Sequence, residues 1–341
     1  MERVIELAQR RGGAFALLAQ RGDEVVLERY QGCGAETLFF AFSVTKPVTA
    51  LAVHLLAARG ALDLDRPIAE YWPGYEVHGK GAITARHVLT HRAGVPSSLP
   101  HVALDMVTMA DAAGSVRRAE QARPRWPAGE RVAYHVVTFG FILGELVRRV
   151  DGRPIDQFLA DEILGPLGLD AYLRLPPGED RRTLQLRALA GNVLTPAYCN
   201  RPATRHAVIP AASLHVTARS LAEFYRVLLR GGKDAGGHQV VPAAAVAGLL
   251  QLSCDGEVDV TLRQRQRYAQ GIQLGGLPGV NRGLGTRSDP QAFGHNGSSV
   301  CNAWADPTRD LVWVHLTNTC PPVRHGLALS AQMSDAVLDA F

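Results

Sequence analysis

Ser43 and Lys46 stand three residues apart at the start of a long apolar segment, in the order Ser43-Val-Thr-Lys46. Residues at this spacing on a helix share one face, so the lysine nitrogen can reach the serine hydroxyl. Desolvation in a buried site lowers the pKa of a lysine, and the neutral amine can then take the serine proton. The pair predicts a serine nucleophile activated by a lysine base, although Ser43 alone would also suit a helix N-cap.

Lysine is otherwise rare in this chain. Only three of the 36 Lys and Arg residues are lysines, at positions 46, 80 and 233. Arginine cannot lose its proton in a protein, whereas lysine can. A lysine retained in an apolar segment therefore favours a role as a base for Lys46.

Two further segments carry groups that could assist such a pair. Tyr134 precedes an apolar stretch of helical pattern, where its phenol could enter a cleft and share a proton with Lys46. Taken alone, it would equally suit a half-buried interface tyrosine. The segment Gly294-His-Asn-Gly-Ser298 lies at a predicted strand edge. Its glycines allow close approach to the backbone, and its free amides can stabilise an oxyanion, although by itself the segment reads as a turn.

In this order, the three motifs resemble the penicilloyl-serine transferase superfamily, which includes class C β-lactamases, penicillin-binding peptidases and family VIII carboxylesterases. Five stretches are similar to the esterase-like branch, namely residues 42–50, 88–96, 134–140, 163–169 and 293–297. The resemblance implies that Ser43 is the acylated nucleophile and that Lys46 and Tyr134 form a coupled base that also protonates the leaving group. It further implies that the amides of Ser43 and Ser298 form the oxyanion hole.

Two positions depart from the motifs of that superfamily. The Y-x-N motif has Val136 in place of the asparagine that would hold the substrate amide and the lysine. The K-T-G motif reads His295-Asn296-Gly297, which we expect to contact the substrate, with a histidine that is mostly neutral near pH 7 in place of a permanent cation. Both departures favour esters over β-lactams, and they leave open a catalytically inactive binding protein on the same fold.

The hydrophobic pattern predicts where the sheet and the helices come from. We expect a helix over residues 1–10, a hairpin of strands 14–20 and 24–30, and a buried helix from Ser43 to Gly60. Helices are then expected at residues 83–92, 138–150, 155–163 and 220–230. Further strands are expected at residues 268–274, 292–294, 299–305 and 311–318, with a final helix over residues 326–341.

This order of elements predicts an α/β domain with an inserted helical domain. The α/β domain, residues 1–60 and 266–341, has an antiparallel sheet built from both chain ends and flanked by helices, and residues 61–265 form the mainly helical insertion. The resemblance implies the β-lactamase/transpeptidase-like fold. Loops over residues 96–109 and 191–210 are expected to shape the pocket.

Composition narrows the classes of function. The 341 residues are 47% hydrophobic with a net charge of +4, and no apolar run reaches the roughly 20 residues of a membrane span. The scattered arginines do not predict nucleic-acid binding. We expect no cofactor and no metal, since His87 and His91 lack a third ligand. The start of the chain lacks a secretory pattern, which predicts a cytoplasmic protein.

These features together predict a serine hydrolase that acts on a small ester or amide through a covalent acyl-enzyme. If an amine or alcohol acceptor outcompetes water, the same chemistry makes the protein an acyltransferase. The sequence leaves both reactions open, and it also leaves open a homo-oligomer.

Overall fold

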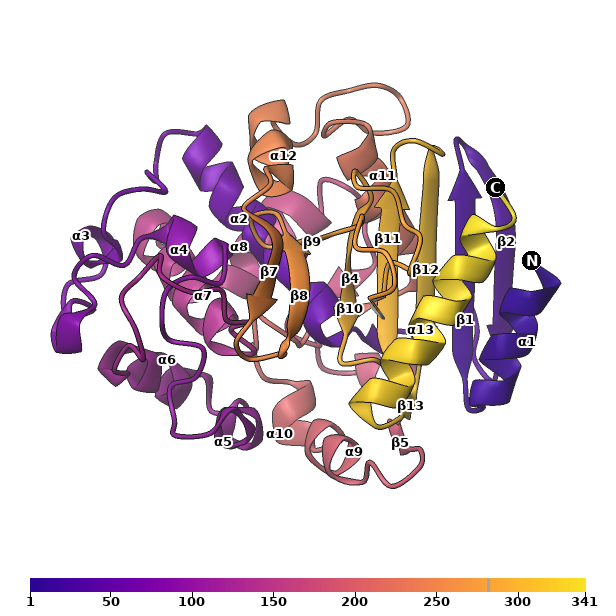
Figure 1. Ribbon diagram of the computed structural model, residues 1–341, viewed down its shortest axis with the longest axis horizontal. Helices are drawn as coiled ribbons and strands as arrows, with labels where there is room; N and C mark the ends of the chain where they lie inside the picture. Colours follow the sequence, from indigo (N-terminus) through magenta and orange to yellow (C-terminus); the bar gives the residue numbers. More distant parts are fainter. Residues whose placement is uncertain (281–282) are drawn as a thin grey trace.

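The computed structural model describes residues 1–280 and 283–341, and its central element is an eight-stranded antiparallel sheet (Figure 1). The strand order is β2-β1-β12-β11-β10-β9-β8-β7, so β1 from the start of the chain pairs directly with β12 from near its end. The strands are β1 (Phe15–Arg21), β2 (Glu24–Gln31), β7 (Cys254–Asp259), β8 (Gln264–Tyr268), β9 (Gln273–Leu274), β10 (Phe293–Gly297), β11 (Cys301–Asp306) and β12 (Leu311–Thr317). The predicted sheet built from both chain ends is confirmed.

Helices cover both faces of this sheet. On one face, α1 (Glu2–Arg11) and α13 (Val323–Leu338) lie side by side (Figure 1). They pack on alternate residues of the strands, including Phe15, Trp304 and Trp313. On the other face, α11 (Ala218–Leu229) packs against β1, β11 and β12. Strand β12 is buried along its whole length because apolar layers cover both of its faces.

The remaining helices form a layer beside the sheet. The buried helix α2 (Thr45–Ala58) lies between them and the sheet, and packs against α7 (Thr138–Asp151) and α12 (Ala243–Leu250). Other helices of this part are α3 (Ile68–Tyr71), α4 (Ala85–Leu89), α5 (Val102–Thr108), α6 (Ala112–Gln121), α8 (Ile155–Leu159), α9 (Leu194–Cys199) and α10 (Pro202–Arg205). In the part of the chain that the structure describes, no helix is both long and apolar enough to cross a bilayer.

Short strands join this helical part to the sheet region. The three-stranded sheet β3-β6-β4 and the two-stranded sheet β13-β5 complete the fold. Their strands are β3 (Phe39–Phe40), β4 (Ala171–Tyr172), β5 (Arg187–Ala188), β6 (His215–Val216) and β13 (Thr319–Cys320).

The sheet extends further into the middle of the chain than the sequence predicts. After the first hairpin, strands are expected again only from about residue 266, yet β7 begins at Cys254 and the expected boundary falls inside β8. Helix α11 also packs on the sheet rather than within the helical layer. Strand β8 has the sequence Gln264-Arg-Gln-Arg-Tyr268, and such a polar segment lacks the apolar alternation by which half-buried strands are recognised.

Candidate active site

Ser43 lies in a short 3-10 helix, η1 (Phe42–Val44), that leads directly into α2. The preceding residue, Phe42, has a φ of 51°, in the left-handed region that a bulky side chain rarely adopts. Strained backbone of this kind persists only where the surrounding packing enforces it, and it concentrates at functional sites. Here it fixes the direction in which the Ser43 side chain leaves the backbone.

Lys46 lies one turn further along, with its nitrogen beside the Ser43 hydroxyl. Its Nζ is 3.1 Å from Ser43 Oγ, and donates to the carbonyl oxygens of Val136 at 2.8 Å and Ala211 at 3.2 Å. The side chain is fully buried, and this burial lowers the pKa of Lys46 well below its ordinary value. No ion pair among the described residues includes Lys46, so no carboxylate holds its proton in place.

Lys80 provides a comparison within the same chain. It is also fully buried, and burial lowers its pKa to about 8. Its Nζ donates to three carbonyl oxygens, those of Val77, Glu120 and Ala122, at 2.8, 2.6 and 2.9 Å. Three acceptors require the three N–H groups of an ammonium, so Lys80 is a structural cation. A buried lysine in a lysine-poor chain is therefore not by itself a sign of a base.

Tyr134 packs directly against Lys46. The Lys46 Nζ lies 4.8 Å from the centre of the tyrosine ring. Burial raises the pKa of Tyr134 above its ordinary value, and the neighbouring Ser43 side chain partly opposes this rise. The Tyr134 hydroxyl has no hydrogen-bond partner among the described residues. The site thus combines an amine that gives up its proton easily with a phenol that keeps its own.

The end of β10 approaches Ser43 from the opposite side. A Cβ on Gly297 would lie 2.3 Å from the carbonyl oxygen of Ala41, so only glycine allows this approach. The following turn contains Ser298 and Ser299, with φ values of 51° and 61°. The side chain of Asn296 accepts a hydrogen bond from the Ser299 amide at 2.8 Å, which holds the turn against the strand.

His295 is not among the described residues that line the pocket, although the sequence predicts that it contacts the substrate. Its side chain is buried, its ring centre lies 6.1 Å from that of Tyr134, and its Nδ1 donates to the Asn296 carbonyl oxygen at 2.8 Å. Burial lowers the pKa of His295 to about 3, so the ring is neutral. Successive residues of a strand point to opposite faces, and here Asn296 faces the pocket while His295 does not.

These residues surround a pocket of about 220 Å³. Of the predicted site residues, Ser43, Tyr134, Asn296 and Ser298 line it, and Lys46 lies beneath Ser43. The described residues that line it carry no charged side chain. They are Ser43, Met106, Tyr134, Val136, Leu262, Gln264, Gln266, Gln273, Gly283, Asn296, Ser298, Ser299, Val323 and Leu327.

Comparison with known protein families gives a match over nearly the whole chain. A family model described as Beta-lactamase matches residues 1–337. This chain belongs to the beta-lactamase family. The superfamily inferred from the motifs is thereby confirmed.

Several described proteins and solved structures are similar to this chain. The chain is 28% identical to the esterase/beta-lactamase LipL of Mycobacterium tuberculosis, over 91% of this chain and 78% of that protein. It resembles the crystal structure of a penicillin-binding protein homolog from Caulobacter crescentus, with a TM-score of 0.84 and 27% identity over 100% of this chain and 97% of the other. A family VIII carboxylesterase matches with a TM-score of 0.80 and 25% identity, over 97% and 96% of the two chains. These similarities support serine hydrolase activity.

The structure also shows pocket residues that the sequence does not single out. Gln264, Gln266 and Gln273 line the pocket from β8 and β9. The run Arg263-Gln-Arg-Gln-Arg267 contains three of the scattered arginines, and its two glutamines face the pocket. The alternation of arginine and glutamine in this run could have indicated a strand, because it has the two-residue period of strand side chains. Of the expected pocket loops, residues 96–109 contribute Met106, whereas residues 191–210 contribute none of the described lining residues.

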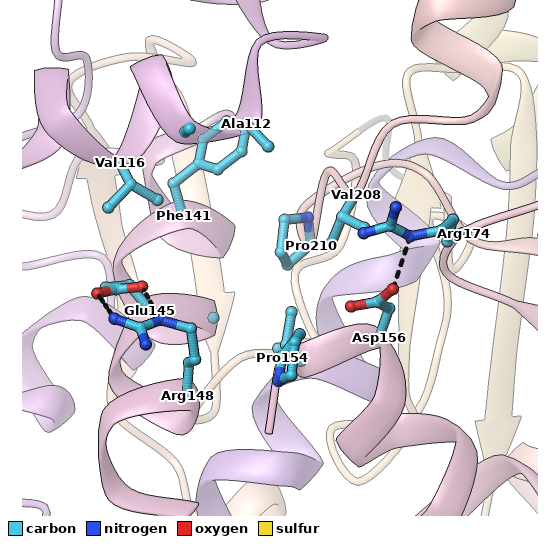
Figure 2. Close-up of a pocket in the computed structure, with 13 residues that line it drawn as sticks. Ala112, Val116, Phe141, Glu145, Arg148, Pro154, Asp156, Arg174, Val208 and Pro210 are labelled. Carbon is cyan, nitrogen blue, oxygen red and sulfur yellow. Dashed lines mark hydrogen bonds and ion pairs between the residues drawn. The ribbon is translucent and has the colours of Figure 1, made fainter. Parts of the chain in front are cut away.

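The segment that ends at Pro210 lies instead against a second, separate pocket of about 340 Å³. Figure 2 shows this pocket, with the Glu145–Arg148 ion pair on one side and the Asp156–Arg174 ion pair on the other. None of the predicted site residues lines it. Pro210 forms part of its wall, and the carbonyl of Pro210 accepts a hydrogen bond from Thr49, one turn after Lys46.

The two histidines considered as metal ligands have other partners. His87 accepts a hydrogen bond from the Thr84 amide in a capping box at the start of α4. His91 Nδ1 accepts a hydrogen bond from the amide of His135 at 3.2 Å. Both imidazoles therefore act in local structure.

Proposed function

We propose that this member of the beta-lactamase family is a serine hydrolase that cleaves small uncharged carboxylic esters through an acyl-enzyme on Ser43. One observation carries the proposal: the Lys46 nitrogen has two carbonyl oxygens and the Ser43 hydroxyl as its three neighbours.

This arrangement fits a neutral amine. A neutral lysine has two N–H groups and one lone pair, whereas the ammonium has three N–H groups. The carbonyls of Val136 and Ala211 accept the two N–H groups, which leaves the lone pair directed at the Ser43 hydroxyl. Burial lowers the pKa of Lys46 in the same direction. Lys80, with three carbonyls, offers no such lone pair.

The carbonyl of Val136 also explains how the site works without the asparagine of the Y-x-N motif. The main chain at this position holds the lysine nitrogen at 2.8 Å, so the side chain is not needed for that purpose. Val136 offers no side-chain amide at the position where the motif asparagine would hold a substrate amide, which supports a preference for esters.

The chemical steps follow from these contacts. Ser43 Oγ attacks the ester carbonyl carbon while its proton passes to Lys46, and the amides of Ser43 and Ser298 stabilise the oxyanion. Tyr134, kept protonated by its raised pKa, gives its proton to the departing alcohol and regains one from Lys46. A water molecule then attacks the acyl carbon, and its proton returns to Ser43 through the same base as the carboxylic acid leaves.

The reaction is tested by the hydrolysis of p-nitrophenyl butyrate, with the chromogenic β-lactam nitrocefin as the alternative substrate. Wild-type protein is expected to cleave the ester in preference to the β-lactam, and Ser43→Ala is expected to lose turnover by at least about a hundredfold while it keeps its melting temperature. A folded Ser43→Ala variant that retains ester turnover would rule out Ser43 as the nucleophile. A folded wild-type protein that cleaves neither substrate would instead support a binding protein on this fold.

A further inference from the structure

Of the four carboxamide side chains that line the Ser43 pocket from neighbouring strands, three are buried. They are Gln266 on β8, Gln273 on β9 and Asn296 on β10, and their exposed fractions are 1%, 8% and 9%. The strands β8, β9 and β10 are adjacent in the sheet, and the three side chains are called here the carboxamide wall. Gln273 is aligned with Tyr268 of β8 and Gly294 of β10, so Gln266 and Asn296 lie toward opposite ends of this wall. Buried side-chain amides are normally hydrogen-bonded, so an amide in this wall that has no protein partner indicates a place where a ligand could bind.

Two members of the carboxamide wall, Gln273 and Asn296, accept hydrogen bonds from the protein. Asn296 accepts from the Ser299 amide through Oδ1, and its own main-chain amide donates to Gln273 Oε1 at 3.3 Å. The Nδ2 group of Asn296 has no partner among the described residues. One donor therefore remains free on β10, next to the turn that holds Ser298.

The side-chain amide of Gln266 makes no hydrogen bond to the described residues. Neither its Oε1 nor its Nε2 has a hydrogen-bond partner among the described residues, although both atoms are buried. Leaving one buried polar group unpaired costs about 1–3 kcal/mol. The neighbouring arginines do not use this amide, because Arg265 donates to the Gly256 carbonyl and Arg267 pairs with Asp255 at 2.6 Å on the other side of the strand. An apolar side chain would be less costly for folding alone, so the position points to a ligand.

We propose that Gln266 binds a neutral amide group of the substrate, which makes the preferred substrate an ester that carries a carboxamide. A secondary amide offers one N–H and one carbonyl oxygen, which are complementary to Oε1 and Nε2 of Gln266. A carboxylate would bring only acceptors and would face Oε1 unfavourably. An alkyl group would leave Gln266 unpaired, and sites built to hydrogen-bond a substrate reject analogues that lack the polar group.

This inference rests on the proposed esterase function and names its substrate class. The test uses matched pairs of esters that differ only in an amide. One pair is p-nitrophenyl N-acetyl-β-alaninate and p-nitrophenyl 5-methylhexanoate, which places the amide in the acyl part. The other pair is 2-acetamidoethyl butyrate and 4-methylpentyl butyrate, which places it in the alcohol part. We expect wild-type kcat/KM to be at least about tenfold higher for the amide member of one pair.

The variant Gln266→Leu separates recognition from structure. It is expected to lower that ratio by about tenfold or more and to raise the melting temperature, since an unpaired buried amide is removed. Gln266→Met provides a second apolar variant of similar length. Arg265→Leu, on the opposite side of the same strand, is the control and is expected to leave the ratio unchanged.

The outcomes distinguish this inference from the proposed function. Absence of turnover on every ester would overturn the esterase proposal itself. Turnover of both members of each pair at similar rates would leave the esterase intact and overturn the role of Gln266. A ratio that survives in folded Gln266→Leu and Gln266→Met would do the same, and a lowered melting temperature in both variants would show that Gln266 has a structural partner instead.

Discussion

Arg11 donates a 2.6 Å hydrogen bond to the carbonyl oxygen of Ser299, which is 288 residues further along the chain. The same guanidinium donates to the Thr319 carbonyl at 3.1 Å and is 3% exposed. Burial lowers the pKa of Arg11 to about 10, so it stays charged at neutral pH. The last residue of α1 thus holds the turn that contains Ser298, whose amide we propose as an oxyanion donor.

Replacing Arg11 should disturb catalysis through that turn. We expect Arg11→Met to lower kcat for p-nitrophenyl butyrate by about tenfold or more with little change in KM, because an oxyanion donor acts mainly on the transition state. Arg11→Lys, which keeps one donor, should recover part of the loss. Arg10→Met, at an exposed neighbouring position, is the control. A folded Arg11→Met enzyme with kcat within twofold of wild type would contradict this positioning role.

The two buried lysines should respond oppositely to the same substitution. Lys46→Met is expected to lower kcat/KM by at least about a hundredfold, as for the loss of a general base. Lys80→Met should leave kcat near the wild-type value in folded protein, but should lower the free energy of unfolding by about 3 kcal/mol, because three buried carbonyls lose their donor. Ester kinetics and urea denaturation measure the two effects. Comparable kinetic losses in both variants would contradict the assignment of Lys46 as the base.

The pH dependence of kcat/KM should report Lys46. Because its pKa is lowered, the active neutral form exists above that lowered value and is lost by protonation as the pH falls through it. Activity should therefore rise with pH to a plateau, with an inflection well below 10.5. Tyr134, whose pKa is raised, should cause no decline before about pH 10. Rates measured from pH 5 to 10, corrected for spontaneous hydrolysis, test this profile, and an inflection near 10.5 or a fall between pH 7 and 9 would contradict it.

Buried histidines should make the fold sensitive to mild acid. Burial lowers the pKa of His54, His135 and His215 to about 4, so the unfolded chain binds protons first as the pH falls below about 6.5. Stability should therefore decrease between pH 7.5 and pH 5, by about 2 kcal/mol for each such histidine. Urea denaturation at the two pH values measures the difference. His215→Leu should reduce it by about one such increment, and the exposed His238→Gln should not. Equal stability at both pH values would contradict this account.

The sequence predicts the parts of the site that are local in the chain. Ser43 and Lys46 are one helical turn apart, so their spacing alone places them together. The carbonyls that hold Lys46 come from residues 90 and 165 positions away, and every residue has a carbonyl, so no motif identifies Val136 or Ala211. Lys80 shows that burial alone does not distinguish a structural lysine from a base. The two lysines differ in the third neighbour of the nitrogen, which is a carbonyl oxygen for Lys80 and the Ser43 hydroxyl for Lys46.

Strand pleating accounts for the remaining differences. On β10 the sequence predicts three consecutive residues at the pocket, but alternation turns His295 toward Tyr134 and leaves Asn296 lining the pocket. Strand β8 alternates arginines with glutamines that line the pocket, so it has no apolar face to mark it as a strand. The predicted start of this part of the sheet is therefore too late in the chain. A hydrophobic pattern cannot show a strand whose inward side chains are polar.

The account depends most directly on a covalent bond at Ser43. Intact-protein mass spectrometry after incubation with a fluorophosphonate, in wild type and in Ser43→Ala, measures that bond. We predict a single adduct on the wild-type protein that is absent from Ser43→Ala, and a transient butyryl adduct on wild type alone when p-nitrophenyl butyrate replaces the probe. An equal adduct on folded Ser43→Ala, or no adduct on folded wild-type protein, would contradict the assignment of Ser43 as the nucleophile.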